Sequence, residues 1–146
     1  MSGPLLDRID LHVPVAPVAL DRLTGDEAEE SSAAVRARVE AARARQEERS
    51  GRTGTRTNAE LAGRGLRDAC ALPAGGKQLL AAALRRRGLS ARAIHRVLRV
   101  ARTIADLDGA RDVSLPHLAE AVRYRILTDG VADGSATPLR AERMRY

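Results

Sequence analysis

The sequence contains no phenylalanine and no tryptophan, and Tyr124 and Tyr146 are its only tyrosines. Without large aromatic rings, the core has to be packed from leucine, valine, isoleucine and alanine, which suits helices. Cys70 is the single cysteine, which excludes an internal disulfide and a cysteine-based zinc site and agrees with a reducing cytoplasm. No signal-peptide pattern and no apolar run of membrane-spanning length are present. These absences predict a soluble, cytoplasmic protein with no membrane partner.

A self-sufficient active site is also missing. The GGK stretch at 75–77 looks like a phosphate-binding loop, but the pattern G-x-x-x-x-G-K-[ST] requires glycine at Ala71 and serine or threonine at Gln78. No Ser/His/Asp or Cys/His pairing follows a local catalytic motif. The three histidines share no metal-ligand spacing: His12, His95 and His117. The chain alone is therefore predicted to bind no metal and no cofactor and not to be an enzyme.

Basic residues are concentrated in the later part of the sequence. The first 50 residues carry seven arginines and ten acidic side chains, and residues 51–146 carry eighteen basic and nine acidic ones, for an overall net charge of +6. Within 91–107, a helical projection places Arg92, Arg96 and Arg99 opposite the apolar face. These arginines lack the acidic partners that usually line an exposed helix. Two interpretations stay open: a solvated face, or a face for a phosphate-rich partner.

The periodicity predicts a mainly α fold, a small helical bundle preceded by one β-strand and a long helix. Ile9, Leu11 and Val13 alternate with polar residues, as in a half-buried strand. Helices are expected over about 28–49, 57–70, 77–87, 91–107 and 114–127. One strand alone leaves unpaired backbone groups on both edges. Its sheet is therefore expected either upstream in a longer parent protein, which we favour, or in another copy.

Two stretches together resemble one protein family. SGPLLDRIDLHV (2–13) and GLSARAIHRVLRVARTIADLDG (88–109), followed by HLAEAVRYR (117–125), look like the C-terminal part of the magnesium-chelatase-like AAA+ ATPases of the ComM/YifB group. The resemblance covers about 2–127. It implies that the ATP-binding Walker motifs lie upstream, in an α/β core. The chain would then comprise the edge of that core (2–27), a linker helix and loop (28–56), a helical lid (57–127) and a tail (128–146).

The resemblance implies specific roles for two arginines. Arg8, in the turn LLDRID, matches an arginine finger that reaches in trans into the ATP site of a neighbouring subunit. Arg92, in the sequence SAR, matches the sensor-2 position, where a lid arginine contacts the nucleotide phosphates. Arg96 and Arg99 match no named motif. The full-length protein is accordingly expected to be a homo-hexameric motor that uses ATP with Mg²⁺.

DNA is the substrate that the resemblance implies, since the ComM group is linked to branch migration during natural transformation. One alternative is the lid of a magnesium chelatase subunit, which inserts metal into a porphyrin. A second is a stand-alone DNA-binding module that uses 85–87 and the face of Arg92, Arg96 and Arg99. A third is an interaction scaffold that needs neither nucleotide nor DNA. The lack of aromatic stacking platforms counts against direct contact with bases.

Overall fold

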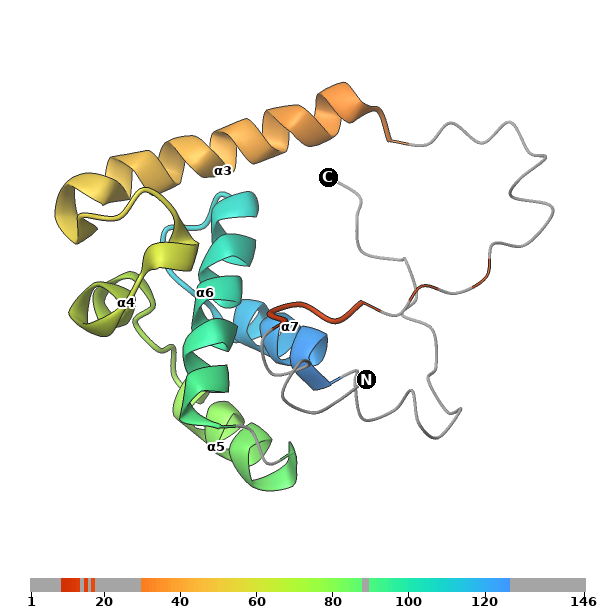
Figure 1. The fold of residues 1–146 in the computed structure, drawn as a ribbon, viewed down its shortest axis with the longest axis vertical. Coiled ribbons are helices and arrows are strands. Elements are labelled where there is room, and N and C mark those ends of the chain that lie inside the picture. Colours follow the sequence, from red (N-terminus) through yellow and green to blue (C-terminus); the bar gives the residue numbers. More distant parts are fainter. Residues whose placement is uncertain (1–8, 14, 16, 18–29, 88–89, 127–146) are drawn as a thin grey trace.

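Helices account for all the regular structure in the part of the chain that the computed structural model describes, residues 9–13, 15, 17, 30–87 and 90–126. In chain order they are α3 (Ser32–Thr53), the short 3-10 helix η1 (Asn58–Glu60), α4 (Gly63–Ala69), α5 (Gly76–Arg87), α6 (Ala91–Leu107) and α7 (Leu115–Ile126). α6 lies at the centre, with α3 crossing near its C-terminal end and α5 close to its start (Figure 1). The mainly α fold class is confirmed.

α6 supplies the centre of the hydrophobic core. Ser90 caps its first turn, because the Ser90 hydroxyl oxygen accepts the N–H of Ala93 at 3.2 Å. One face of the helix is almost fully buried at Val97, Ala101 and Ala105, and these short side chains let neighbouring helices approach closely. The rest of the core is aliphatic too, and includes Leu61, Leu66, Leu80, Val113, Leu118 and Val122. The predicted aliphatic core and the predicted bounds of this helix, 91–107, are both confirmed.

α3 differs from the predicted helix over 28–49 at both ends. It starts at Ser32, because the Ser31 hydroxyl oxygen accepts the N–H of Ala34 at 3.2 Å and caps the first turn. It continues through Gly51 and ends at Thr53, followed by the capping residue Gly54, whose φ of 69° is left-handed. Packing of α3 against α6 offsets the free-energy cost of placing a glycine within a helix. No helix within the described ranges is long and apolar enough to cross a membrane.

The single helix predicted over 57–70 is wrong, because η1 and α4 are separate elements. Thr57 makes no side-chain cap; its hydroxyl donates to the Glu60 carboxylate at 3.0 Å instead. The carbonyl oxygen of Leu61 accepts the Arg99 Nε–H at 2.8 Å, so it points to α6 rather than along a continuing helix. Gly63 then adopts a φ of 50° as α4 begins, a conformation that suits glycine.

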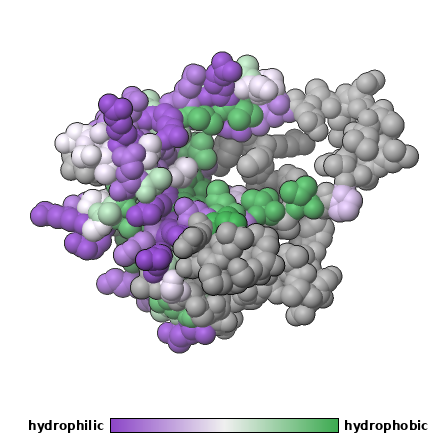
Figure 2. Space-filling view, viewed as in Figure 1, coloured by the Kyte–Doolittle hydropathy of each residue, from purple (hydrophilic) through white to green (hydrophobic). Residues whose placement is uncertain are grey.

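The β-strand predicted for residues 9–13 is not formed in the described part of the chain. The segment lies beside α7, and within the described residues its one backbone hydrogen bond to a helix runs from the His12 N–H to the Tyr124 carbonyl oxygen, at 2.9 Å. A strand requires a ladder of such bonds to a second extended segment, and α7 offers none. The apolar side chains of the segment remain largely exposed: Ile9, Leu11, Val13 and Val15. Hydrophobic side chains show as green on the surface in the middle of Figure 2.

Because of Cys70, we expect the stability of the fold to depend on pH in the alkaline range. Burial raises the pKa of the Cys70 thiol from 9.0 to about 11, and its Sγ–H donates to the Leu98 carbonyl oxygen. Between these two values the unfolded chain ionises while the folded chain keeps its proton, so stability should fall by up to about 2–3 kcal/mol. Burial also raises the pKa of Tyr124, which acts in the same direction. Urea unfolding at pH 8 and pH 11 measures the loss, and Cys70→Ala should make it smaller; an equal loss in both proteins would contradict this account.

Candidate functional site

Arg92 lies in the first turn of α6 with its side chain exposed. It forms no hydrogen bond or ion pair with another residue in the described ranges. The backbone N–H groups of a first helical turn are unpaired within the helix, and the helix dipole makes this end positive. Ser90 accepts one of these groups, that of Ala93. Arg92 therefore adds a permanent positive charge at a position that already favours anions.

The next two arginines of α6 are held by partners within the chain. Arg96 Nε lies 3.2 Å from the Asp10 carboxylate. Arg99 Nε donates to the carbonyl oxygen of Leu61. The expectation that Arg96 lacks an acidic partner is therefore wrong, and the three arginines do not form one open cationic face. Arg92 is the member that remains available to an outside ligand.

Among the residues that the structure describes, three contacts join the segment 9–12 to α6 and α7. Besides the Asp10–Arg96 ion pair and the His12 N–H bond, the Arg125 guanidinium donates to the carbonyl oxygen of Ile9. The residue immediately before this segment is Arg8, the predicted arginine finger, which lies outside the described residues. The structure therefore brings the neighbours of Arg8 in the chain to the helix that carries Arg92.

A buried ionic network around Asp106 joins α3, η1 and α6, and sequence reasoning missed it. The Asp106 carboxylate is 0% exposed and pairs with both Arg49 of α3 and Arg102 of α6, the latter at 3.0 Å. It also accepts the Asn58 side-chain N–H at 2.8 Å. Arg102, itself 1% exposed, donates to two carbonyl oxygens in the loop 110–111, at 2.8 and 2.9 Å. Such charges are tolerated inside a protein only when they are paired and hydrogen-bonded.

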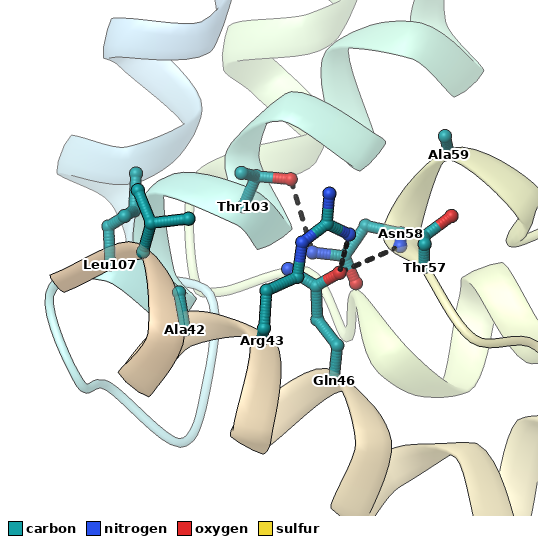
Figure 3. Close-up of a pocket in the computed structure, with 9 residues that line it drawn as sticks. Ala42, Arg43, Gln46, Thr57, Asn58, Ala59, Thr103 and Leu107 are labelled. Carbon is teal, nitrogen blue, oxygen red and sulfur yellow. Dashed lines mark hydrogen bonds between the residues drawn. The ribbon is translucent and has the colours of Figure 1, made fainter. Parts of the chain in front are cut away.

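A cleft of about 320 Å³ opens beside this network, between α3, η1 and α6 (Figure 3). Nine residues line it: Val39, Ala42, Arg43, Gln46, Thr57, Asn58, Ala59, Thr103 and Leu107. Gln46 Oε1 accepts hydrogen bonds from the Arg43 side chain at 3.2 Å and the Asn58 backbone N–H at 3.4 Å. The Asn58 side chain in turn donates to Thr103 at 3.1 Å. These polar groups bond to one another across the junction of α3 with the bundle, so we assign no ligand to the cleft.

His117 has a structural role in the first turn of α7. Its Nδ1 accepts the N–H of Ser114 at 3.0 Å, so its Nε2 carries the proton and donates to the Asp108 carboxylate at 3.1 Å. This arrangement fixes the start of α7 against the end of α6. Within the described residues, no three His, Cys, Asp or Glu side chains are grouped closely enough to hold a metal ion.

The helical bundle that carries these contacts matches a known protein family. Residues 29–125 fit the family model for the C-terminal part of magnesium chelatase, subunit ChlI. The chain belongs to this family. The ChlI C-terminal match begins just before α3 and ends within α7, so it takes in all the described helices. The predicted resemblance to magnesium-chelatase-like proteins is confirmed.

Relatives of this ChlI C-terminal domain include much longer proteins. The chain is 44% identical over 129 residues to competence protein ComM of Haemophilus influenzae, and 42% identical over 129 residues to the protein YifB of Escherichia coli. Both alignments cover 87% of this chain and 24% of the relative. An uncharacterized protein of Mycobacterium tuberculosis is 38% identical over 125 residues, 86% of the chain and 25% of that protein. The chain thus spans about a quarter of the length of these relatives.

Proposed function

We propose that this chain is the lid portion of an ATP-hydrolysing AAA+ motor, and that Arg92 contacts the phosphates of the nucleotide. The observation that carries this proposal is the position of Arg92, exposed and without a partner in the described ranges, at the positive end of α6. Membership of the ChlI C-terminal family and the identity with competence protein ComM support the AAA+ assignment.

Phosphate is the ligand chemistry that suits this end of α6. A guanidinium is always charged and presents a rigid fork of donors that matches phosphate oxygens. The same helix is fixed in the core by Val97, Ala101 and Ala105, so a displacement of the lid carries Arg92 with it. Contact between Arg92 and the nucleotide would therefore couple the position of the lid to ATP binding. In the full-length protein the nucleotide would be ATP with Mg²⁺.

The proposal also includes two partners of the full-length protein, namely neighbouring subunits and DNA. Arg8 would act as the arginine finger in the ATP site of the next subunit of a homo-hexamer. DNA is the proposed substrate, which the similarity to a competence protein supports. A free-standing DNA-binding module is the weaker candidate, since Arg96 and Arg99 are held within the chain.

Arg92→Ala in the full-length protein tests the proposed phosphate contact. We expect kcat for ATP hydrolysis to fall by about 10²-fold, the usual effect of removing one donor to a developing charge. Arg67→Ala is the matched control, because Arg67 is also an exposed arginine and lies on α4. Steady-state turnover at saturating ATP is the measurement. Equal turnover in the two variants would refute a nucleotide role for Arg92.

The same assay separates the candidate substrates. Under the proposal, branched DNA raises the ATP turnover of the unmodified protein, and Arg92→Ala removes this stimulation. Stimulation by a porphyrin but not by DNA would overturn the DNA assignment and favour a chelatase.

A further inference from the structure

The face of α3 that packs against α6 continues beyond the bundle as an exposed apolar stripe. In the junction, Ala42 and Gln46 are 3% and 6% exposed, and Arg49 forms an ion pair with α6. Val35 and Val39 lie on the same face, because the series 35, 39, 42, 46 and 49 advances by alternating steps of four and three residues. Val35 and Val39 are nevertheless 40% and 46% exposed. Alternating steps of this kind are the spacing of a coiled-coil seam, into which a partner helix inserts apolar side chains of its own.

The exposed stripe is continuous with an established interface. Every residue of α3 before Ala42 is exposed, and Figure 1 shows this half of the helix extending beyond α6. At its inner end, Val39 shares the wall of the cleft with Leu107, which is 43% exposed. Val35, Val39 and Leu107, which we call the α3 seam, therefore extend the α3–α6 packing onto a surface that the described residues leave open.

Arginines line both sides of the α3 seam. With Val35 at position d of a heptad and Val39 at position a, the e and g positions from 36 to 45 are all arginine: Arg36, Arg38, Arg43 and Arg45. The acidic residues of α3 fall at positions b and c, away from the seam: Glu40, Glu47 and Glu48. Charges at e and g set the choice of partner, so this arrangement selects an acidic one.

One of these arginines already binds a carboxylate. The Arg38 guanidinium donates through both Nη atoms to the two oxygens of Glu30, in a bidentate pair on the surface. Arg36 is exposed and forms no hydrogen bond or ion pair with another residue in the described ranges. Arg43 is exposed as well, and its bond at 3.2 Å is to the neutral side chain of Gln46. Arg36 and Arg43 are therefore available to the carboxylates of a partner.

We propose that the α3 seam docks an acidic amphipathic helix of a partner protein, with apolar side chains against the seam and carboxylates against Arg36 and Arg43. A second copy of this chain is disfavoured, because two α3 seams in either orientation would place arginine opposite arginine. DNA phosphates would pair with the arginines but would leave the valines between them in water. An acidic helix satisfies both groups. The inference does not depend on a nucleotide, since Arg92 lies at the opposite end of α6 from the crossing with α3.

Two labelled peptides of three heptads test the docking, both with leucine at a and d, one with glutamate and the other with lysine at e and g. Fluorescence anisotropy with the 146-residue chain should show the glutamate peptide binding at least about 10-fold more tightly than the lysine peptide. Arg36→Glu should weaken binding of the glutamate peptide roughly 3- to 10-fold and strengthen binding of the lysine peptide. Val39→Ser should weaken binding of the glutamate peptide. Arg67→Glu, which changes the net charge equally but on α4, is the control and should leave both affinities unchanged.

The alternative occupants give results that would overturn the proposal. Equal affinity for the two peptides, or an equal loss in Arg36→Glu and Arg67→Glu, would show that the α3 seam does not select the acidic helix. Binding of duplex DNA but not of the glutamate peptide would assign the arginines to phosphate. Self-association of the chain that Val39→Ser abolishes would assign the seam to a second copy. A full-length protein that fails to bind the peptide that the 146-residue chain binds would show that another part of the same protein covers α3.

Discussion

Asp106→Asn should lower the free energy of unfolding of this chain by about 3–5 kcal/mol, the cost of removing one partner from a buried ion pair. The carboxylate is fully buried and serves Arg49, Arg102 and Asn58 together. Asparagine keeps the size of the side chain but leaves the Arg102 guanidinium, 1% exposed, without a counter-charge. Since small domains are stable by only about 5–15 kcal/mol, the loss should move the urea midpoint of the helical circular dichroism signal substantially.

Asp68→Asn is the matched control for Asp106→Asn. Arg64 and Asp68 form an ion pair at the same i, i+4 spacing as Arg102 and Asp106, but their side chains are 88% and 65% exposed. An exposed pair of this kind is worth less than about 1 kcal/mol, so the control should unfold almost as the parent does. Similar losses in the two variants would show that Asp106 is not the charge that stabilises the network.

The same two pairs show where sequence patterns stop being informative. Both read Arg-x-x-x-Asp on a helix, and nothing local distinguishes them. Their burial differs because α3 and η1 cover Asp106. Its carboxylate accepts hydrogen bonds from Arg49, 57 residues away, and from Asn58, 48 residues away. Long-range partners of this kind cannot be inferred from spacing, and the network was therefore missed.

Elements with complete local signals were predicted well, and those that depend on distant contacts were not. α6 has a serine cap, a regular apolar face and Asp108-Gly109 at its end, and its predicted bounds agree with the structure. The sequence of the helix predicted over 57–70 begins with a capping box, Thr57 followed three residues later by Glu60. The Leu61 carbonyl, which could have accepted a hydrogen bond within that helix, instead accepts one from Arg99, 38 residues away. The strand predicted over 9–13 is not formed within the described residues, because a strand requires a second extended segment, and the prediction placed that partner upstream in a parent protein or in another copy.

The candidate site follows the same rule. The helical projection predicted that Arg92 lies opposite the apolar face of α6, and the exposed side chain of Arg92 agrees with that prediction. The same projection placed Arg96 and Arg99 there as well, yet both are satisfied by residues far away in the sequence. Periodicity identifies which face a side chain occupies, whereas availability to a ligand depends on what else packs against that face.

Arg8→Ala should abolish ATP turnover by the full-length protein, with a loss of about 10³-fold or more and ATP binding retained. A finger acts only as charge develops on the transferred phosphoryl group, so its removal leaves the ground-state affinity for ATP nearly unchanged. A surface arginine that merely pairs with a nearby aspartate would contribute under about 1 kcal/mol and would leave turnover close to normal. Turnover and nucleotide affinity, measured on the same preparation, separate the two roles.

Mixing the two arginine variants decides whether Arg8 acts in trans. Under the proposed function, Arg8→Ala subunits would keep Arg92 in their own ATP site, and Arg92→Ala subunits would keep Arg8 for the site of a neighbour. In a ring with head-to-tail interfaces, an equal mixture should form one complete site at roughly one interface in four, so activity should reappear from two inactive preparations. A mixture that stays inactive although the subunits co-assemble would mean that both arginines serve the site of their own subunit. Recovery requires that the proposed finger and the proposed lid arginine come from different chains at each interface.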